Sequence, residues 1–304
     1  MNEERLETLL SVYRYRGAMP DFRSVIRTVE DSGPPLSGRP RAAVPHWPRL
    51  AAAAAVLIAI VAITQWPPPN QWHTTAIVPR VLHSGDVVTT RDSQMQLRSR
   101  AVGIIDVGAN TTLRLVGRNR FELAAGMIHA KTTSPPGIFI VDTPRARATD
   151  LGCEYTLAVS PNGEGILRVS AGWVGLTREW DQSLVPQGAK AIIRSNGRLS
   201  PPIFEDAPPP FQQAVIRGDL KGALPLARRR DALTLINLFR FANEEERLMI
   251  YDRLNTLVPA PPTVTRDALR YGSIRTVEPW WPDVMKASGV TSIKKKKRGM
   301  LPPS

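Results

Sequence analysis

Cysteine and histidine are scarce in this sequence. Its 304 residues include one cysteine, Cys153, and four histidines, at positions 46, 73, 83 and 129. A single cysteine excludes an intrachain disulfide and any zinc or iron–sulfur site that needs several thiolates. The histidines are too scattered to form a helical metal-binding motif. We therefore expect no metal ion and no other cofactor, and the cysteine content leaves the cellular compartment open.

Acidic residues are also few. There are 27 Asp and Glu against 40 Lys and Arg, a net charge of +13, which favours anionic partners such as nucleic acid or phospholipid headgroups. The basic tail 286–304 contains "KKKKR" but no interleaved aromatic residue and no recognition motif, so we expect a flexible end and no nucleic-acid binding. The 42% hydrophobic content is sufficient for a packed core.

Polar residues are absent between Leu50 and Ile63. A helix of this run alone covers about 21 Å, less than the hydrocarbon core of about 30 Å. Extending it between Trp47 and Trp66 gives about 28 Å, and tryptophan is favoured at both membrane interfaces. We therefore predict a transmembrane helix at 49–66; a buried core helix is the alternative.

The charges on the two sides of this helix are unequal. Arg39, Arg41 and Arg49 precede it without a nearby acid, Arg49 at the membrane interface, whereas no charged residue occurs between Thr64 and Pro79. Excess arginine marks the cytoplasmic side. We therefore predict a single-pass membrane protein whose N-terminus lies in the cytoplasm.

The N-terminal region precedes this span. Segment 1–31 predicts two short helices, the first with Leu6, Leu9 and Leu10 on one face, and 32–48 is a proline-rich linker. Two short helices cannot bury a core unaided. We expect them to bind a protein partner or to be loosely ordered.

Residues 79–198 have the rhythm of an all-β domain. Glycine or proline turns recur every eight to twelve residues, and the intervening runs, such as "TLRLV" and "EYTLAVS", are rich in β-branched residues. This predicts an antiparallel sandwich or roll. In "DVGANT" we predict a hairpin turn at Gly108 and Asn110, because a phosphate loop would be followed by a helix.

Downstream, the pattern becomes helical. The segment 199–210, "LSPPIFEDAPPP", is predicted to be a second proline-rich linker. In the region 211–285 we predict three or four short helices up to Gly272, including a capping box formed by Asn243 and Glu246. Trp280 and Trp281 are expected to serve as core or docking residues.

Four blocks in the β region, taken together, resemble the FecR domain. They are "GIIDVGANTTLRL", "FELAAGMIHA", "GIFIVDTPRARATDLGCEYTLAV" and "ILRVSAGWVGL", in the family's order and at similar spacing. The family positions matched here are Asp106, Gly108, Asn110, Thr111, Gly126, Thr143, Pro144, Gly152, Cys153 and Gly172. Cys153 stands where the family usually has threonine.

The resemblance implies a FecR-like antiparallel β fold in a signal transducer. It also implies that the chain is anchored by one span in the bacterial inner membrane, with a cytoplasmic N-terminus and periplasmic C-terminal domains. Its better-understood members regulate an extracytoplasmic-function sigma factor through the cytoplasmic end, in response to an outer-membrane receptor. We accordingly expect a sigma factor to bind residues 1–49, and a periplasmic or outer-membrane receptor to bind the β and helical domains. A non-signalling envelope scaffold that binds protein or glycan through the β domain is the alternative.

Few residues are candidates for catalysis. Cys153 and His129 are the thiol–imidazole pair that the β domain offers, and a nucleophilic cysteine needs such a neighbour. Cys153 follows a predicted turn, however, where a small buried residue serves equally well. Asp142 before "TP" is expected to form an Asx turn, and Asp150 and Glu154 to lie at strand ends. We predict that the protein is not an enzyme; an envelope hydrolase is the third alternative.

Overall fold

The computed structural model describes residues 71–75, 78–179, 181–271 and 274–290. All of them belong to one compact unit, Pro68–Ser304. The predicted helical segment 1–31, linker 32–48 and transmembrane helix 49–66 fall outside the described residues. Among the helices that are described, none combines the length and the apolar character needed to cross a bilayer.

Fifteen strands occupy the described residues from 72 to 204, and every pair is antiparallel except β7 with β8. The predicted mainly antiparallel β class is confirmed. The strands are β1 (Trp72–Thr74), β2 (Val81–Leu82), β3 (Val87–Thr89), β4 (Met95–Ser99), β5 (Gly103–Val107), β6 (Thr112–Gly117), β7 (Arg120–Thr132), β8 (Ile140–Asp142), β9 (Arg147–Asp150), β10 (Glu154–Val159), β11 (Gly165–Ala171), β12 (Trp173–Arg178), β13 (Asp181–Pro186), β14 (Ala189–Ile193) and β15 (Ile203–Phe204).

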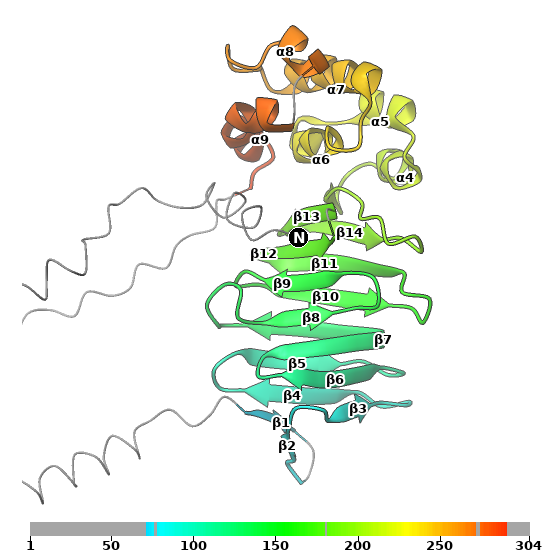
Figure 1. Ribbon diagram of the computed structural model, residues 1–304, viewed down its shortest axis with the longest axis vertical. Coiled ribbons are helices and arrows are strands. Elements are labelled where there is room, and N and C mark those ends of the chain that lie inside the picture. Colours follow the sequence, from blue (N-terminus) through cyan, green and yellow to red (C-terminus); the bar gives the residue numbers. More distant parts are fainter. Residues whose placement is uncertain (1–70, 76–77, 180, 272–273, 291–304) are drawn as a thin grey trace, which may run out of the picture. The chain divides into compact units, whose positions relative to one another are not determined.

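The strands form two layers that share β7 (Figure 1). Layer A has the order β2-β1-β4-β5-β7-β10-β11-β14-β15. Layer B has the order β3-β6-β7-β8-β9-β12-β13. The first half of β7 pairs with β6 and β8, and its second half pairs with β5 and β10. This one strand therefore joins the layers by hydrogen bonds.

The crossing point in β7 is Gly126, whose φ is +106°. Before it, Phe121 and Leu123 are buried; after it, Ile128 and Ala130 are buried. The inward positions thus change from odd to even numbers, which a regular strand does not allow because its side chains alternate strictly. The irregularity at Gly126 lets both halves of β7 contribute to the same core.

The predicted hairpin at "GAN" is wrong, although the segment is a turn. β5 pairs with β4 and β7, while β6 pairs with β3 and β7, so the strands on either side of the turn lie in different layers. Asn110 has the expected positive φ, +52°, whereas Gly108 is absent from the positive-φ glycines. The turn is a corner between the layers, because β5 pairs with the second half of β7 and β6 pairs with its first half.

The β domain begins earlier than the predicted boundary at residue 79. Trp72 on β1 is 1% exposed and packs edge-on against Phe121, with ring centroids 5.1 Å apart, and 5.8 Å from the ring of Phe139. These three rings come from segments distant in sequence. The spacing of turns in the sequence could not place β1 in the β domain, because Trp72 belongs to the domain through contacts with residues far along the chain.

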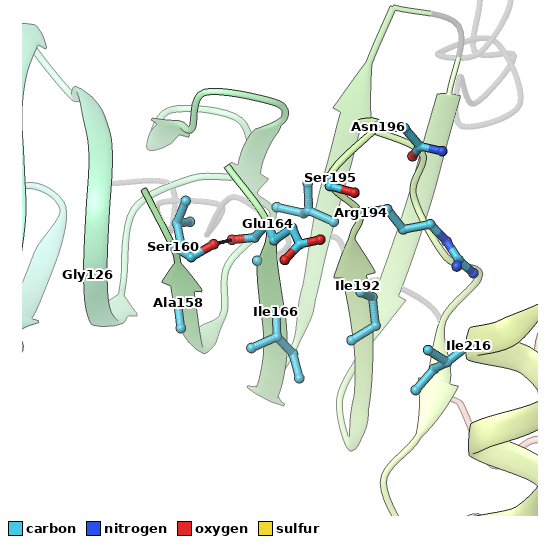
Figure 2. A pocket seen from close by; sticks show the side chains of 13 residues that line it. Gly126, Ala158, Ser160, Glu164, Ile166, Ile192, Arg194, Ser195, Asn196 and Ile216 are labelled. Atoms are coloured by element: carbon cyan, nitrogen blue, oxygen red, sulfur yellow. Dashed lines mark hydrogen bonds between the residues drawn. The ribbon is translucent and has the colours of Figure 1, made fainter. Parts of the chain in front are cut away.

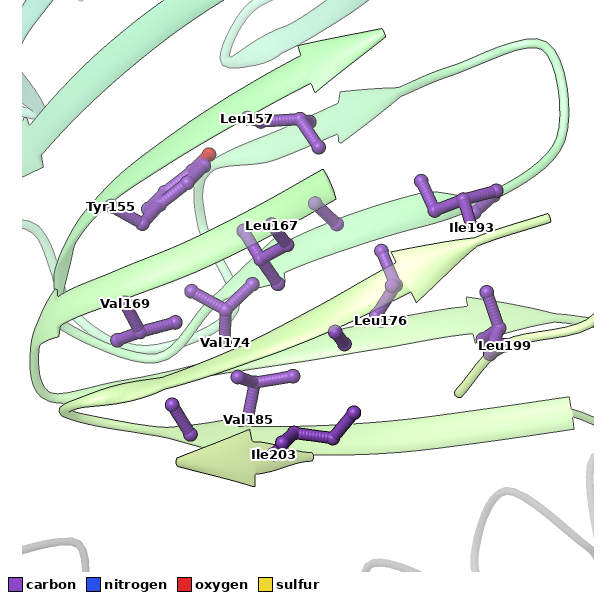
Figure 3. Close-up of a cluster of buried hydrophobic side chains, with 14 of the residues drawn as sticks. Tyr155, Leu157, Leu167, Val169, Val174, Leu176, Val185, Ile193, Leu199 and Ile203 are labelled. Carbon is purple, nitrogen blue, oxygen red and sulfur yellow. The ribbon is translucent and has the colours of Figure 1, made fainter. Parts of the chain in front are cut away.

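The hydrophobic core lies between the two layers. Figure 3 shows one end of it, where Tyr155 and Leu167 from layer A meet Val174 and Leu176 from layer B. All four side chains are fully buried. This is the alternation expected when each strand turns one face to the core and the other outward.

Segment 199–210 is not an exposed linker. Leu199, Ile203 and Phe204 are each at most 3% exposed, and β15 pairs with β14. Its prolines fit because β15 is two residues long and lies at the edge of layer A, where a missing N–H breaks no ladder. The segment therefore packs the helical region against the β layers.

Up to Tyr271, the described C-terminal residues form five α-helices and one 3-10 helix, more than the three or four helices predicted up to Gly272. The described helices of the whole C-terminal region are α4 (Pro209–Arg217), α5 (Leu220–Leu226), the 3-10 helix η1 (Arg229–Asp231), α6 (Ala232–Leu238), α7 (Glu244–Leu257), α8 (Arg266–Tyr271), the 3-10 helix η2 (Ile274–Trp280) and α9 (Trp281–Ala287). The additional helices are short. They begin after prolines or polar capping residues, which the sequence prediction did not recognise as helix starts.

Two local predictions in this region are confirmed. Asn243 and Glu246 form the capping box of α7, in which each backbone N–H donates to the other residue's side chain over 2.9 Å. Trp280 is fully buried and lies 5.5 Å from the ring of Tyr251. The boundary of the basic tail is corrected: in 286–290, Ser288 is buried and accepts a hydrogen bond from the Leu233 N–H, while residues from 291 lie outside the described part.

Candidate functional site

The corner between the layers is held by a buried threonine, Thr111. Its hydroxyl accepts a hydrogen bond from the Met127 N–H (3.0 Å), and its own N–H donates to Thr90 Oγ1 (3.0 Å). A Cβ on Gly126 would lie 2.3 Å from Thr111 Oγ1. At Gly108 the N–H donates to the Met127 carbonyl. These motif positions therefore brace the crossing of β7.

A second set of motif positions forms the turn between β8 and β9. Thr143 Oγ1 accepts a hydrogen bond from the Ala146 N–H over 2.9 Å, with Pro144 between them. The expected Asx turn at Asp142 is wrong. Its carboxylate is bound by Arg120 and by Arg147, which come from β7 and β9, so the acid joins strands and the adjacent threonine makes the turn.

A third set surrounds a buried carboxylate, Asp150, at the end of β9. The hydroxyl of Thr132 and the thiol of Cys153 donate to it, and so does the Gly152 N–H (3.0 Å). Burial raises the pKa of Asp150, and these donors oppose the shift. Gly172 is required nearby, since a Cβ there would lie 2.3 Å from the Gly152 carbonyl oxygen. The Cys153 thiol thus fills a donor role that a threonine hydroxyl can also fill.

Cys153 and His129 do not come together. Cys153 is 4% exposed and belongs to the core, whereas His129 lies on the outer side of β7, between the inward residues Ile128 and Ala130. Burial and the charge of Asp150 raise the pKa of the thiol, the opposite of what a nucleophile needs. The thiol–imidazole pair suggested by the sequence is therefore absent.

His129 belongs to a polar cluster on the outer face of layer A. Its Nδ1 lies 3.0 Å from Thr156 Oγ1, and its Nε2 lies 3.3 Å from a carboxylate oxygen of Glu154. Lys131 binds the other oxygen at 3.2 Å and lowers the pKa of Glu154. Near this cluster, the Asp106 carboxylate accepts a hydrogen bond from Gln96. Such cross-strand pairs stabilise a solvated sheet face.

An open groove of about 760 Å³ lies on the same face, over β10, β11 and β14 (Figure 2). Ala158, Ile166 and Ile192 line it, and Ile216 of α4 stands at its end. Ser160, Glu164 and Arg194 are among its polar lining residues. Sequence reasoning missed this groove. The sequence did contain a sign of the groove, however, because the apolar residues Ile166 and Ile192 occupy outward-facing positions of their strands.

The described residues contain no group of three or more His, Cys, Asp or Glu side chains that could hold a metal ion. The expected membrane-interface residues Trp47, Arg49 and Trp66 lie outside the described part of the chain. The described candidate residues therefore lie at turns and close approaches of the fold, and the open groove is formed by other residues on the outer face of layer A.

Comparison with known proteins gives limited similarity. No family model matches the chain, and no curated protein matches it. Two crystal structures of Parabacteroides distasonis proteins, provisionally named anti-sigma factors, have a TM-score of 0.34 each. The first is 18% identical and aligns with 44% of this chain; the second is 17% identical and aligns with 45%. The alignments span 65% and 74% of those two chains, respectively.

Proposed function

We propose that the protein is a FecR-like, single-pass membrane signal transducer. In this proposal a periplasmic binding event at the β and helical region controls a cytoplasmic transcription regulator, a sigma factor, through residues 1–49. In this proposal the protein binds its partners and passes on the signal, and it catalyses no reaction.

The observation that carries the proposal is the agreement between the four sequence blocks and the corners of the fold. Gly108, Thr111 and Gly126 meet at the crossing of β7, while Gly152 and Gly172 meet beside Asp150. Five of the ten positions that make the sequence resemble the FecR domain thus lie at the close approaches of this two-layer fold. The apolar run after Leu50 and the arginines before it support a membrane anchor with the N-terminus inside.

A non-catalytic role is supported by the environment of the candidate nucleophile. Cys153 is buried, donates a hydrogen bond to Asp150 and has no imidazole partner among the described residues. A ligand can change the output of such a protein only by binding two of its states with different affinity.

The first test is membrane topology. Alkaline phosphatase and a fluorescent protein are fused separately after residues 45, 75 and 200 of the chain. We expect fluorescence at the first position and phosphatase activity at the other two. Fluorescence at all three would refute the anchor, and with it the periplasmic sensor.

The second test concerns the output. The tagged full chain should co-purify a sigma factor, and a chain that lacks residues 1–31 but keeps the arginines before the anchor should not. Deletion of the gene should change the transcripts controlled by that factor. If no sigma factor co-purifies with the full chain and the transcripts are unchanged, the result favours the scaffold alternative.

A further inference from the structure

The outer face of layer A carries a row of apolar side chains that the core does not use. Met127 pairs with Ala158, Ala158 with Ile166, and Ile166 with Ile192, so the four residues stand side by side on β7, β10, β11 and β14. Met127 is 44% exposed and the other three are partly exposed. Ile216 of α4 continues the row at one end of the groove (Figure 2).

The row next to this apolar row is polar and basic. Two residues away on each strand, on the same side, His129 pairs with Thr156, Thr156 with Arg168, and Arg168 with Lys190. Arg168 forms an ion pair with Glu205 (2.9 Å), and Lys190 forms none among the described residues. The face therefore combines an apolar strip with a flank on β11 and β14 that carries the positive charge of Lys190 beside the Arg168–Glu205 ion pair.

The direction of the apolar row limits what can cover it. The row runs across the strands, with steps of about 4.8 Å. An extended peptide would need a free strand edge, but the edge of β14 at Ile192 is already bonded to Ser200, and Arg194 donates to the Arg198 carbonyl. A helix needs no edge, and its turns of about 5.4 Å nearly match the strand steps.

We propose that this face docks an amphipathic α-helix of a partner protein, with carboxylate side chains along one side of the helix. The apolar side of the helix covers Ala158, Ile166 and Ile192, and its acidic side lies over Arg168 and Lys190. The complementary charge fixes the rotation of the helix about its axis, and Ile216 limits its position at one end. Docking does not depend on which signal the proposed transducer passes on.

The test uses a labelled helical peptide of about 15–20 residues with leucines on one face and glutamates along one flank. A matched peptide carries lysines in place of the glutamates. Binding to the full chain in nanodiscs of zwitterionic lipid is followed by fluorescence anisotropy. We expect the acidic peptide to bind and the basic peptide to bind at least about tenfold more weakly.

Three variants locate the binding. Ile166→Ser should weaken the acidic peptide at least about tenfold, because it removes a central apolar contact. Lys190→Glu should weaken the acidic peptide and strengthen the basic one. Val116→Ser is the control, since Val116 is 38% exposed on β6 of layer B and lies outside the row. Circular dichroism checks that each variant is folded.

The proposal is overturned if the acidic peptide does not bind, if the two peptides bind equally, or if Val116→Ser weakens binding as much as Ile166→Ser. Loss of peptide binding on addition of anionic vesicles would assign the face to a lipid surface and would also overturn it. None of these outcomes bears on the topology of the chain, so failure here is distinct from failure of the proposed signalling function.

Discussion

Gly126 should be among the glycines of the β domain that least tolerate a side chain. It allows β7 to cross between the layers with φ at +106°, a value that residues with a Cβ rarely adopt. A Cβ there would also lie 2.3 Å from Oγ1, 2.4 Å from Cα and 2.6 Å from Cβ of Thr111. Because the Cα belongs to the backbone, no change of rotamer can relieve the overlap.

The expected cost of Gly126→Ala has two parts. A strained backbone conformation costs about 1–3 kcal/mol, and overpacking a close contact costs about 1–3 kcal/mol, which together give about 2–6 kcal/mol. Gly85 supplies the matched control, since its φ is +98° and a Cβ there would meet nothing within 4 Å. Gly85→Ala should show the backbone cost alone.

Urea unfolding of the full chain, followed by far-ultraviolet circular dichroism, measures both variants. Both glycines have φ near +100°, so the difference between the variants mainly reports the contact with Thr111. Equal loss of unfolding free energy in the two variants would show that Thr111 moves aside easily. The tight crossing of β7 would then not be what requires a glycine.

Three further predictions concern the buried polar groups and the caps. Cys153→Thr should be tolerated, whereas Cys153→Ala should cost about 1–3 kcal/mol in urea unfolding because buried Asp150 loses a donor; equal losses would contradict this role. Burial raises the folded-state pKa of Asp150 above its usual 3.8, so the folded state binds the proton more tightly. This group's contribution to stability should therefore rise as pH falls from the folded pKa toward the unfolded pKa, and a pH series should show that Asp150→Asn removes this slope. Asn243→Ala should lower stability by about 1 kcal/mol and Asn243→Ser should not, as thermal unfolding would show.

Local features were the ones that the sequence predicted well. The β class follows from short β-branched runs between turns, and the cap of α7 follows from Asn243 and Glu246 three residues apart. Each depends on a few neighbouring residues and on backbone chemistry. The positive φ of Asn110 is another case, because asparagine tolerates that conformation in a turn.

Long-range pairing was not predictable in the same way. Nothing near Trp72 indicates that it packs against Phe121, and a proline-rich stretch gives no sign that Ile203 will be buried. One missed feature did leave a trace in the sequence. The apolar positions of β7 change phase between Leu123 and Ile128, around Gly126, and this phase change is what a strand shared by two layers needs.

The junction after β15 connects the helical region to the strand β14. Asp206 forms ion pairs with Arg228 and Arg230, each at 3.3 Å, but these side chains are well exposed, and such pairs contribute little to stability. The buried hydrogen bond from Thr234 Oγ1 to the Pro202 carbonyl, at 2.7 Å, and the burial of Phe204 contribute more. Because β15 pairs directly with β14, α6 is connected through buried contacts to the strand that carries Ile192 and Lys190. These buried contacts hold α6 to the β layers, so loss of the Asp206 ion pairs alone should leave that connection intact.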